Sequence, residues 1–156
     1  MINNNFEKKL KSKEFVFTAE TSPPDSTVRS EITDRVLCLK DLADAINVTD
    51  GASAKSHLSS LVVSSIIKDI EIEPILQLTT RDRNRIAIQS DLLGAWTLNI
   101  QNILCIYGDQ VETGDQPETK EVRDLDTLGV INTANYFKKE KKFPSGRSIT
   151  SAPEFF

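Results

Sequence analysis

The chain has 156 residues, the length of a single domain, and this is enough to bury a sizeable hydrophobic core. Charged residues make up 27% and hydrophobic residues 38%, with only 6 glycines and 6 prolines, which excludes collagen-like and low-complexity classes. The net charge of -4 argues against a nucleic-acid partner, because binding a polyanion requires a basic surface.

No segment predicts export or membrane insertion. The first residues are polar and rich in lysine, and they lack the apolar stretch of a secretory signal. The longest apolar segment, residues 58–67, is far shorter than the roughly 20 residues that a membrane-spanning helix requires. We therefore expect a cytoplasmic protein with no membrane partner. Cys38 and Cys105 are too few for a disulfide framework, and we expect both to be buried as small hydrophobic residues.

The first expected strand leads to a carboxylate. After a short helix over Asn5–Lys11, the apolar residues 15–19 predict a strand that ends at Glu20. The next segment, residues 21–25, contains two consecutive prolines, each of which fixes its own φ and restricts the residue before it. Glu20 is therefore expected at the end of a strand, beside a rigid loop.

Helices and strands then alternate along the chain. Apolar residues at helical spacing predict helices over about 26–42, 57–69, 85–99 and 125–137, the first of them capped by Asp25 or Ser26. Short apolar runs predict strands over 44–48, over 74–78, and from Asn102 to the glycine at 108. A long loop, residues 110–120, follows that last strand, and residues 149–156 indicate the start of a fifth strand.

This alternation with short connections indicates an α/β protein with a parallel sheet and right-handed crossovers. We expect a single domain over residues 1–156. Two architectures fit. An open flavodoxin-like sheet suits the length, whereas a (β/α)8 barrel typically needs about 250 residues and would be represented here only by its first half.

Polar residues stand at the end of every predicted strand. They are Glu20, Thr49 with Asp50, Gln77 with Thr79, and Tyr107 with Gly108 and Asp109. Packing does not explain such a set on otherwise apolar strands, and ligands of α/β proteins bind at the carboxyl ends of the strands, so the set predicts a functional site. Gly108 would let the backbone approach a ligand, and Asp109 would point a charge at it. Glu20 can serve as a general acid if burial raises its pKa.

Other kinds of site have weaker signals. The spacing of Asp109, Glu112 and Asp115 does not match an EF-hand, so no metal is expected. His57 is the only histidine and has no serine or cysteine nucleophile at a telling spacing, so we expect it at a helix start or in a loop. The sequence contains neither a P-loop nor a G-x-G-x-x-G fingerprint.

Several ordered motifs are similar to those of the flavin-dependent methylenetetrahydrofolate reductases. The motifs lie at 19–24, 45–51, 81–95, 102–109, 114–117 and 124–126. They span nearly the whole chain, and they most resemble the branch of the family with an Arg-Asp-Arg-Asn motif, which is Arg81 to Asn84 here.

The resemblance implies a fold and a reaction. The family is a (β/α)8 barrel that holds a flavin, FAD or possibly FMN, at the carboxyl ends of its strands. It transfers a hydride from the reduced flavin to 5,10-methylenetetrahydrofolate and so gives 5-methyltetrahydrofolate. By this resemblance, Glu20 matches the general acid that assists opening of the folate imidazolidine ring. Asp109 matches the carboxylate near the flavin pyrimidine and the folate pterin, and the remaining flavin-contacting positions match Thr49, Ala52, Gln77, Tyr107, Gly108 and Val122.

The chain also departs from the family pattern. Thr21 and Ser22 stand where the family often has aromatic residues, Asp25 where it has a basic residue, and Tyr107 where a basic residue or threonine is usual. The resemblance covers only the amino-terminal half of a TIM barrel, about four to five βα units. The family's remaining flavin and folate contacts, which include a folate-binding glutamine, have no counterpart here.

Two partners follow from the resemblance besides the folate. One is an electron donor, which in this family is a nicotinamide, ferredoxin or a partner subunit. The other is a second copy or a missing carboxyl-terminal half that completes the barrel. Two alternatives to the enzyme remain open. One is a non-catalytic half-barrel that serves as a binding or interaction module, and the other is an open-sheet protein of unrelated function.

Overall fold

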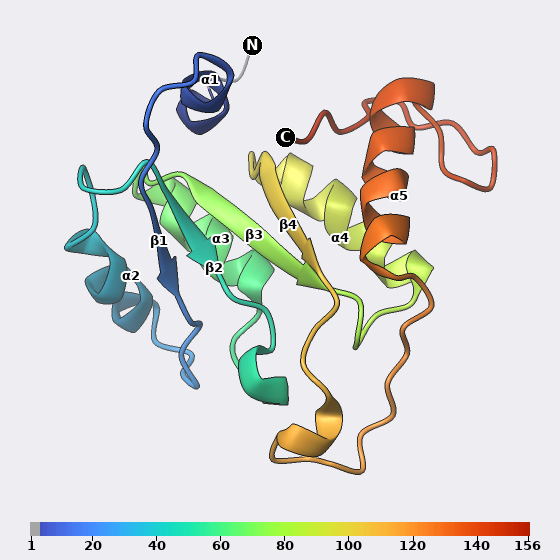
Figure 1. Cartoon of the computed structure of the whole chain (residues 1–156), viewed down its shortest axis with the longest axis horizontal. Helices are drawn as coiled ribbons and strands as arrows, with labels where there is room; N and C mark the ends of the chain where they lie inside the picture. The colour runs from blue at the N-terminus through green and yellow to red at the C-terminus, as the bar shows by residue number, and fades with distance from the viewer. Residues whose placement is uncertain (1–3) are drawn as a thin grey trace.

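The computed structural model describes residues 4–156 and contains one parallel sheet (Figure 1). Its strands are β1 (Thr18–Thr21), β2 (Ala45–Val48), β3 (Pro74–Thr79) and β4 (Asn102–Ile106). They pair in the order β1-β2-β3-β4, and every pair is parallel. The predicted α/β class is therefore confirmed. A flavodoxin-like sheet reverses its winding after the first strand. The described strands do not reverse, so the flavodoxin-like alternative is wrong.

Four of the helices cover one face of this sheet (Figure 1). They are α2 (Arg29–Leu37), α3 (Ser60–Asp69), α4 (Arg85–Thr97) and α5 (Thr127–Glu140). Ile46 of β2 packs with α2 and α3, and Leu76 of β3 packs with α4 and α5. The short helix α1 (Asn5–Lys11) lies at the amino ends of the strands, where Phe6 contacts Ala45 and Ile75.

The opposite face of the sheet is only partly covered. Successive residues of a strand point to opposite faces, so the residues between those that pack on the helices point to this second face. There, Leu104 of β4 is 42% exposed, whereas Ile75 and Gln77 of β3 are buried. This partly open face and the two edge strands, β1 and β4, are the features of this fold that bear most on function.

Some element boundaries differ from those predicted. β1 begins at Thr18 because the segment before it projects Phe15 and Phe17 into solvent instead of burying them. α2 begins at Arg29, and its N-cap is Val28, which makes no side-chain capping bond. Cys38 is exposed, so the prediction that it is buried is wrong. Cys105 is half-buried against the helices, and this burial raises the pKa of its thiol to about 11.

The predicted fifth strand is present only as a single pairing. The Phe156 N–H donates to the carbonyl of Gln101 (2.9 Å), and the Ile103 N–H donates to the carbonyl of Phe156 (3.3 Å). A parallel neighbour of β4 would make this alternating pattern. No regular strand forms over residues 149–156. Within residues 4–156, no helix is both long enough and apolar enough to cross a membrane.

Candidate functional site

A hollow of about 360 Å³ lies at the carboxyl ends of the four strands. Its volume is within the range of about 300–1,000 Å³ that small-molecule sites occupy. The strands all point toward this end of the molecule, where two short 3-10 helices, η1 (Ala52–Ala54) and η2 (Val111–Thr113), follow β2 and β4 (Figure 1). The lining residues are Glu20, Thr49, Asp50, Ala52, Gln77, Ile106, Gly108 and Asp109.

Six of the predicted site residues therefore meet in one place. Glu20 lies on β1, opposite Asn47 of β2 in the parallel register, and its Oε2 accepts a long hydrogen bond from Gln77 Nε2 (3.4 Å). The Glu20 side chain is exposed, so the described residues do not provide the burial that the general-acid prediction requires. Asn47 Oδ1 is buried and has no hydrogen-bond partner among the described residues.

The loop after β2 has an unusual backbone. Gly51, Ser53 and Ala54 all have positive φ, at 58°, 57° and 54°. Two consecutive non-glycine residues in the left-handed region are strained, and such strain persists only where the surroundings hold it. Asp109 provides one such restraint, because its Oδ2 accepts a hydrogen bond from the Ser53 N–H at 2.8 Å. Thr49, at the start of the loop, donates its hydroxyl to Ser22 Oγ (3.1 Å).

The side chains of Tyr107 and Val122 lie outside this hollow. Tyr107 is exposed, and the Arg123 guanidinium lies over its ring, 3.7 Å from the centroid. Val122 is also exposed, and its N–H donates to the carbonyl of Arg81 (2.8 Å). The structure thus brings together six of the eight predicted residues and leaves these two side chains apart.

Gly108 has a structural reason to be glycine. Its φ is +87°, and a Cβ atom at this position would lie 2.2 Å from Thr79 Oγ1. The preceding carbonyl, of Tyr107, accepts hydrogen bonds from three donors, namely the hydroxyls of Thr79 and Thr80 (both 3.3 Å) and Arg123 Nη1 (2.7 Å). The lack of a side chain at Gly108 is therefore required by its packing against Thr79, and the predicted approach of this backbone to a ligand stays a prediction.

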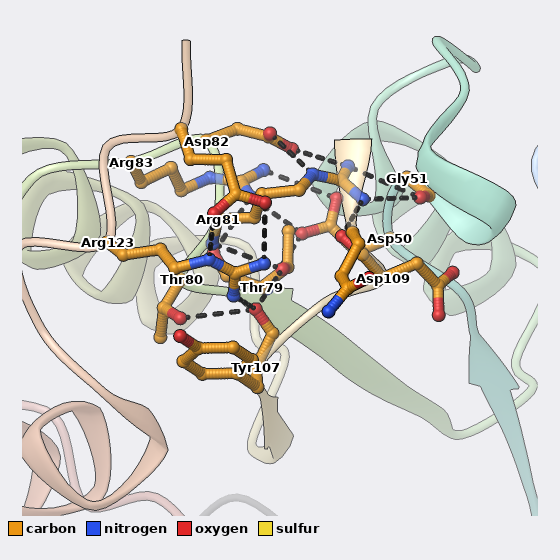
Figure 2. Close-up of polar contacts among 12 residues, drawn as sticks. Asp50, Gly51, Thr79, Thr80, Arg81, Asp82, Arg83, Tyr107, Asp109 and Arg123 are labelled. Carbon is orange, nitrogen blue, oxygen red and sulfur yellow. Dashed lines mark hydrogen bonds and ion pairs between the residues drawn. The ribbon is translucent and has the colours of Figure 1, made fainter. Parts of the chain in front are cut away.

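A buried ion pair supports the floor of the site (Figure 2). Asp50 Oδ2 lies 2.6 Å from Arg83 Nη1 and also accepts the Thr79 N–H at 2.9 Å, while Ser60 Oγ donates to Asp50 Oδ1 at 3.0 Å. Arg83 also contacts Asp91 of α4 at 2.9 Å. Burial opposes the charge of Arg83, but Asp50 and Asp91 together raise its pKa above the usual value.

Arg81 forms a second cluster beside this pair. Its side chain is only 4% exposed and makes two hydrogen bonds to Asp82, at 2.7 and 2.8 Å. From the sequence, both arginines were recognised only as part of the Arg-Asp-Arg-Asn motif, with no role in the site. Alternating arginine and aspartate directly after a buried strand was the signal that could have predicted these pairs.

The fold and the hollow define a class. A parallel sheet that gathers polar groups from all its strand ends is typical of α/β proteins that bind small molecules there. The family model described as methylenetetrahydrofolate reductase matches residues 5–148. This match covers most of the chain, which therefore belongs to the methylenetetrahydrofolate reductase family. A comparison with curated proteins gives no match.

Proposed function

We propose that this chain forms the amino-terminal half of a (β/α)8 barrel and supplies part of a site for reducing 5,10-methylenetetrahydrofolate to 5-methyltetrahydrofolate. Membership of the family supports the reaction. The winding of the sheet supports the barrel, because the four strands follow one another in sequence order and helices cover only one face. A barrel has this arrangement, with its second face turned inward.

The observation that carries the proposal is the meeting of Glu20, Gln77 and Asp109 at one hollow. These residues come from three different strands or strand ends. The Glu20 carboxylate accepts a hydrogen bond from the Gln77 amide, and the Asp109 carboxylate lies toward the opposite edge of the sheet, in the loop after β4. A proton donor and a separate fixed negative charge are the two groups that the reaction asks of this half of the site.

The residues present fit the polar edge of a flavin. Thr49 and Gln77 offer both donors and acceptors, the small side chain of Ala52 leaves room for a flat ring, and Asn47 Oδ1 is an acceptor without a partner among the described residues. A bound FAD or FMN supplies the hydride. Asp109 places a negative charge nearby, which disfavours further negative charge on a ring bound beside it.

Glu20 has the role of general acid in this proposal. Its carboxyl holds a proton and delivers it to a nitrogen of the folate imidazolidine ring, which opens the ring for reduction. Gln77 orients the carboxyl through the bond to Oε2. The second half of the barrel would cover Glu20, which is exposed in this chain alone.

A second candidate is a non-catalytic binding or interaction module. The exposure of Glu20 and of the open sheet face favours it, because an uncovered acid is a poor proton donor to a reaction that must exclude water. Such a module would keep the groups at the strand ends without turnover.

The test is to complete the chain with the second half of a family barrel, supplied as a separate polypeptide. FAD and FMN are added in turn, and binding is followed by flavin fluorescence. The bound flavin is reduced chemically or with a nicotinamide, ferredoxin or a candidate partner subunit, and 5,10-methylenetetrahydrofolate is added. We expect reoxidation of the flavin together with 5-methyltetrahydrofolate, identified by mass. Flavin binding without the folate product would favour the module, and absence of both would contradict the proposed function.

A further inference from the structure

Two arginines follow β3 and have different partners, although they are only two residues apart. Arg83 binds the side chains of Asp50 and Asp91. Arg81 binds one side chain, that of Asp82, and uses the other edge of its guanidinium for backbone carbonyls (Figure 2).

The carbonyls that Arg81 contacts belong to two different loops. Nη1 donates to the Gly51 carbonyl in the loop after β2 (3.3 Å) and to the Asp109 carbonyl in the loop after β4 (3.2 Å). Nη2 also donates to the Gly51 carbonyl (3.3 Å). Because β2 and β4 flank β3, Arg81 joins the loops on both sides of its own strand.

The glycines of these loops show the same close packing independently of the hydrogen bonds. A Cβ atom on Gly51 would lie 2.5 Å from Arg81 Nη2, and one on Gly108 would lie 3.2 Å from Arg81 Cβ. Both loops therefore pack directly against Arg81, at positions where a larger residue would force it to move. A third segment is attached as well, since the Val122 N–H donates to the Arg81 carbonyl.

The geometry of the guanidinium matters more than its charge. Asp82 holds one edge of the fork with two hydrogen bonds, which fixes the direction of the other edge. The hydrogen bond with Asp82, followed by the charges of Asp82, Asp109 and Asp50, raises the pKa of Arg81, so the fork stays protonated. A lysine would keep the charge but could not hold a carboxylate and two carbonyls in one plane.

We propose that Arg81 is a positioning residue that fixes the loop after β2 and the loop after β4 relative to each other, and so sets the Asp109 carboxylate against the Ser53 N–H. The hydrogen bonds of Arg81 are all made within the chain itself. Their meaning for the reaction rests on the proposed function, because these loops carry Ala52 and Asp109.

The test compares Arg81→Lys with Arg83→Lys in the chain without ligand, by amide hydrogen exchange and by the amide proton shift of Ser53. We expect Arg81→Lys to speed exchange about tenfold or more in both segments, residues 51–55 and 108–114, while the amides of β2, β3 and β4 keep their rates. The Ser53 amide proton should move upfield as its bond to Asp109 weakens. Arg83→Lys should leave residues 108–114 and the Ser53 shift unchanged.

Faster exchange in only one segment, in neither, or equally in both variants would overturn the proposal. If Arg81→Lys does not fold, Asp82→Asn decides in its place. This variant removes one of the two acceptor oxygens and the charge that hold the fork but keeps Arg81, and the Asp82 side chain is 43% exposed, so the substitution should be tolerated. A smaller increase in the same two segments supports the proposal, and no increase contradicts it. Since no flavin or folate is present, the result is independent of the proposed function. Adding FMN to the completed barrel then tests that function separately.

Discussion

The Asp109 carboxylate accepts a hydrogen bond from the Ser53 N–H at 2.8 Å and so joins two loops that are 56 residues apart in the sequence. One oxygen of this carboxylate restrains a strained turn, while the residue also lines the hollow. Asp109 therefore combines a structural contact with the charge that the proposed function assigns to it, and different substitutions should separate the two.

Asp109→Asn keeps an oxygen that can accept the Ser53 N–H but removes the charge. In the completed barrel we expect it to raise the flavin reduction potential and to weaken folate binding, because the proposed function places this one carboxylate beside both the flavin and the folate. Dye-equilibration titration measures the potential. Asp109→Ala is the matched variant, and it should also mobilise residues 51–54 in hydrogen exchange. An unchanged potential in both variants would mean that Asp109 does not lie beside the flavin.

Glu20→Gln should abolish folate reduction in the completed barrel and leave reduction of the flavin nearly intact, because only the folate step requires an acid. Stopped-flow absorbance separates the two half-reactions. Gln77→Leu is a useful companion, since it removes the hydrogen bond to Glu20 but keeps the acid, and it should slow the folate step less. A Glu20→Gln protein that still reoxidises with folate at the parental rate would exclude the proposed role.

The pair of buried Asp50 and half-buried Arg83 should matter for stability far more than a surface pair. Asp50→Ala removes one of the two carboxylate partners of the half-buried Arg83 and the acceptor of the Thr79 N–H, and we expect a loss of about 3 kcal/mol in the free energy of unfolding. Asp69→Ala removes the partner of Arg29, where both side chains are 58% exposed, and should change stability by less than about 1 kcal/mol. Urea denaturation measures both, and equal losses would contradict a larger contribution of the Asp50–Arg83 pair to stability.

The contact between Arg85 and Asp124 should make a small part of the stability depend on pH. Hydrogen bonds from the Arg85 side chain and backbone lower the pKa of Asp124 from 3.8 to about 2. Because the folded value lies below the unfolded one, the contact stabilises the fold above about pH 3.8 and is lost as the pH falls through about 2. Arg85→Met should raise the pKa of Asp124 toward 3.8, which a carboxyl NMR titration can measure. No change would mean that the contact does not persist in solution.

The 156-residue chain alone should not be a stable monomer and should not bind flavin tightly. The edge of β1 is unpaired and that of β4 pairs only with Phe156 among the described residues, and Phe17 and Leu104 are exposed near these edges. A second copy can supply strands in the same direction if the two-fold axis coincides with the axis of a closed barrel. Size exclusion with light scattering, recorded together with flavin absorbance, tests this. A monodisperse monomer that elutes yellow would contradict both the half-barrel and the need for a second half.

The sequence predicted the strands β3 and β4 closely because their apolar runs are continuous and end at polar residues. Their strand-end residues Gln77 and Gly108 could be placed in a site for the same reason: parallel strands with short crossovers must share an edge. The helix α2 was predicted too long at both ends, since its N-cap Val28 carries no capping side chain and so gives no local signal.

The roles of Arg81 and Arg83 could not be predicted in this way. Their main partners outside the turn, Gly51 and Asp50, are 30 and 33 residues away, and only the pairing of β2 with β3 brings them close. The exposure of Glu20 is likewise a tertiary property. A carboxylate at a strand end has the same local sequence whether or not another part of a barrel covers it.

The three hydrogen bonds to the Tyr107 carbonyl fix more than one oxygen atom. The peptide group that joins Tyr107 to Gly108 is planar, so an oxygen held by Thr79, Thr80 and Arg123 prevents the whole plane from flipping. In a trans peptide the N–H points away from the carbonyl, so the Gly108 N–H is directed away from those three donors. The positive end of this peptide dipole therefore has a constant direction beside the hollow, and a glycine that would otherwise be among the most mobile residues of the loop acts as a rigid electrostatic element.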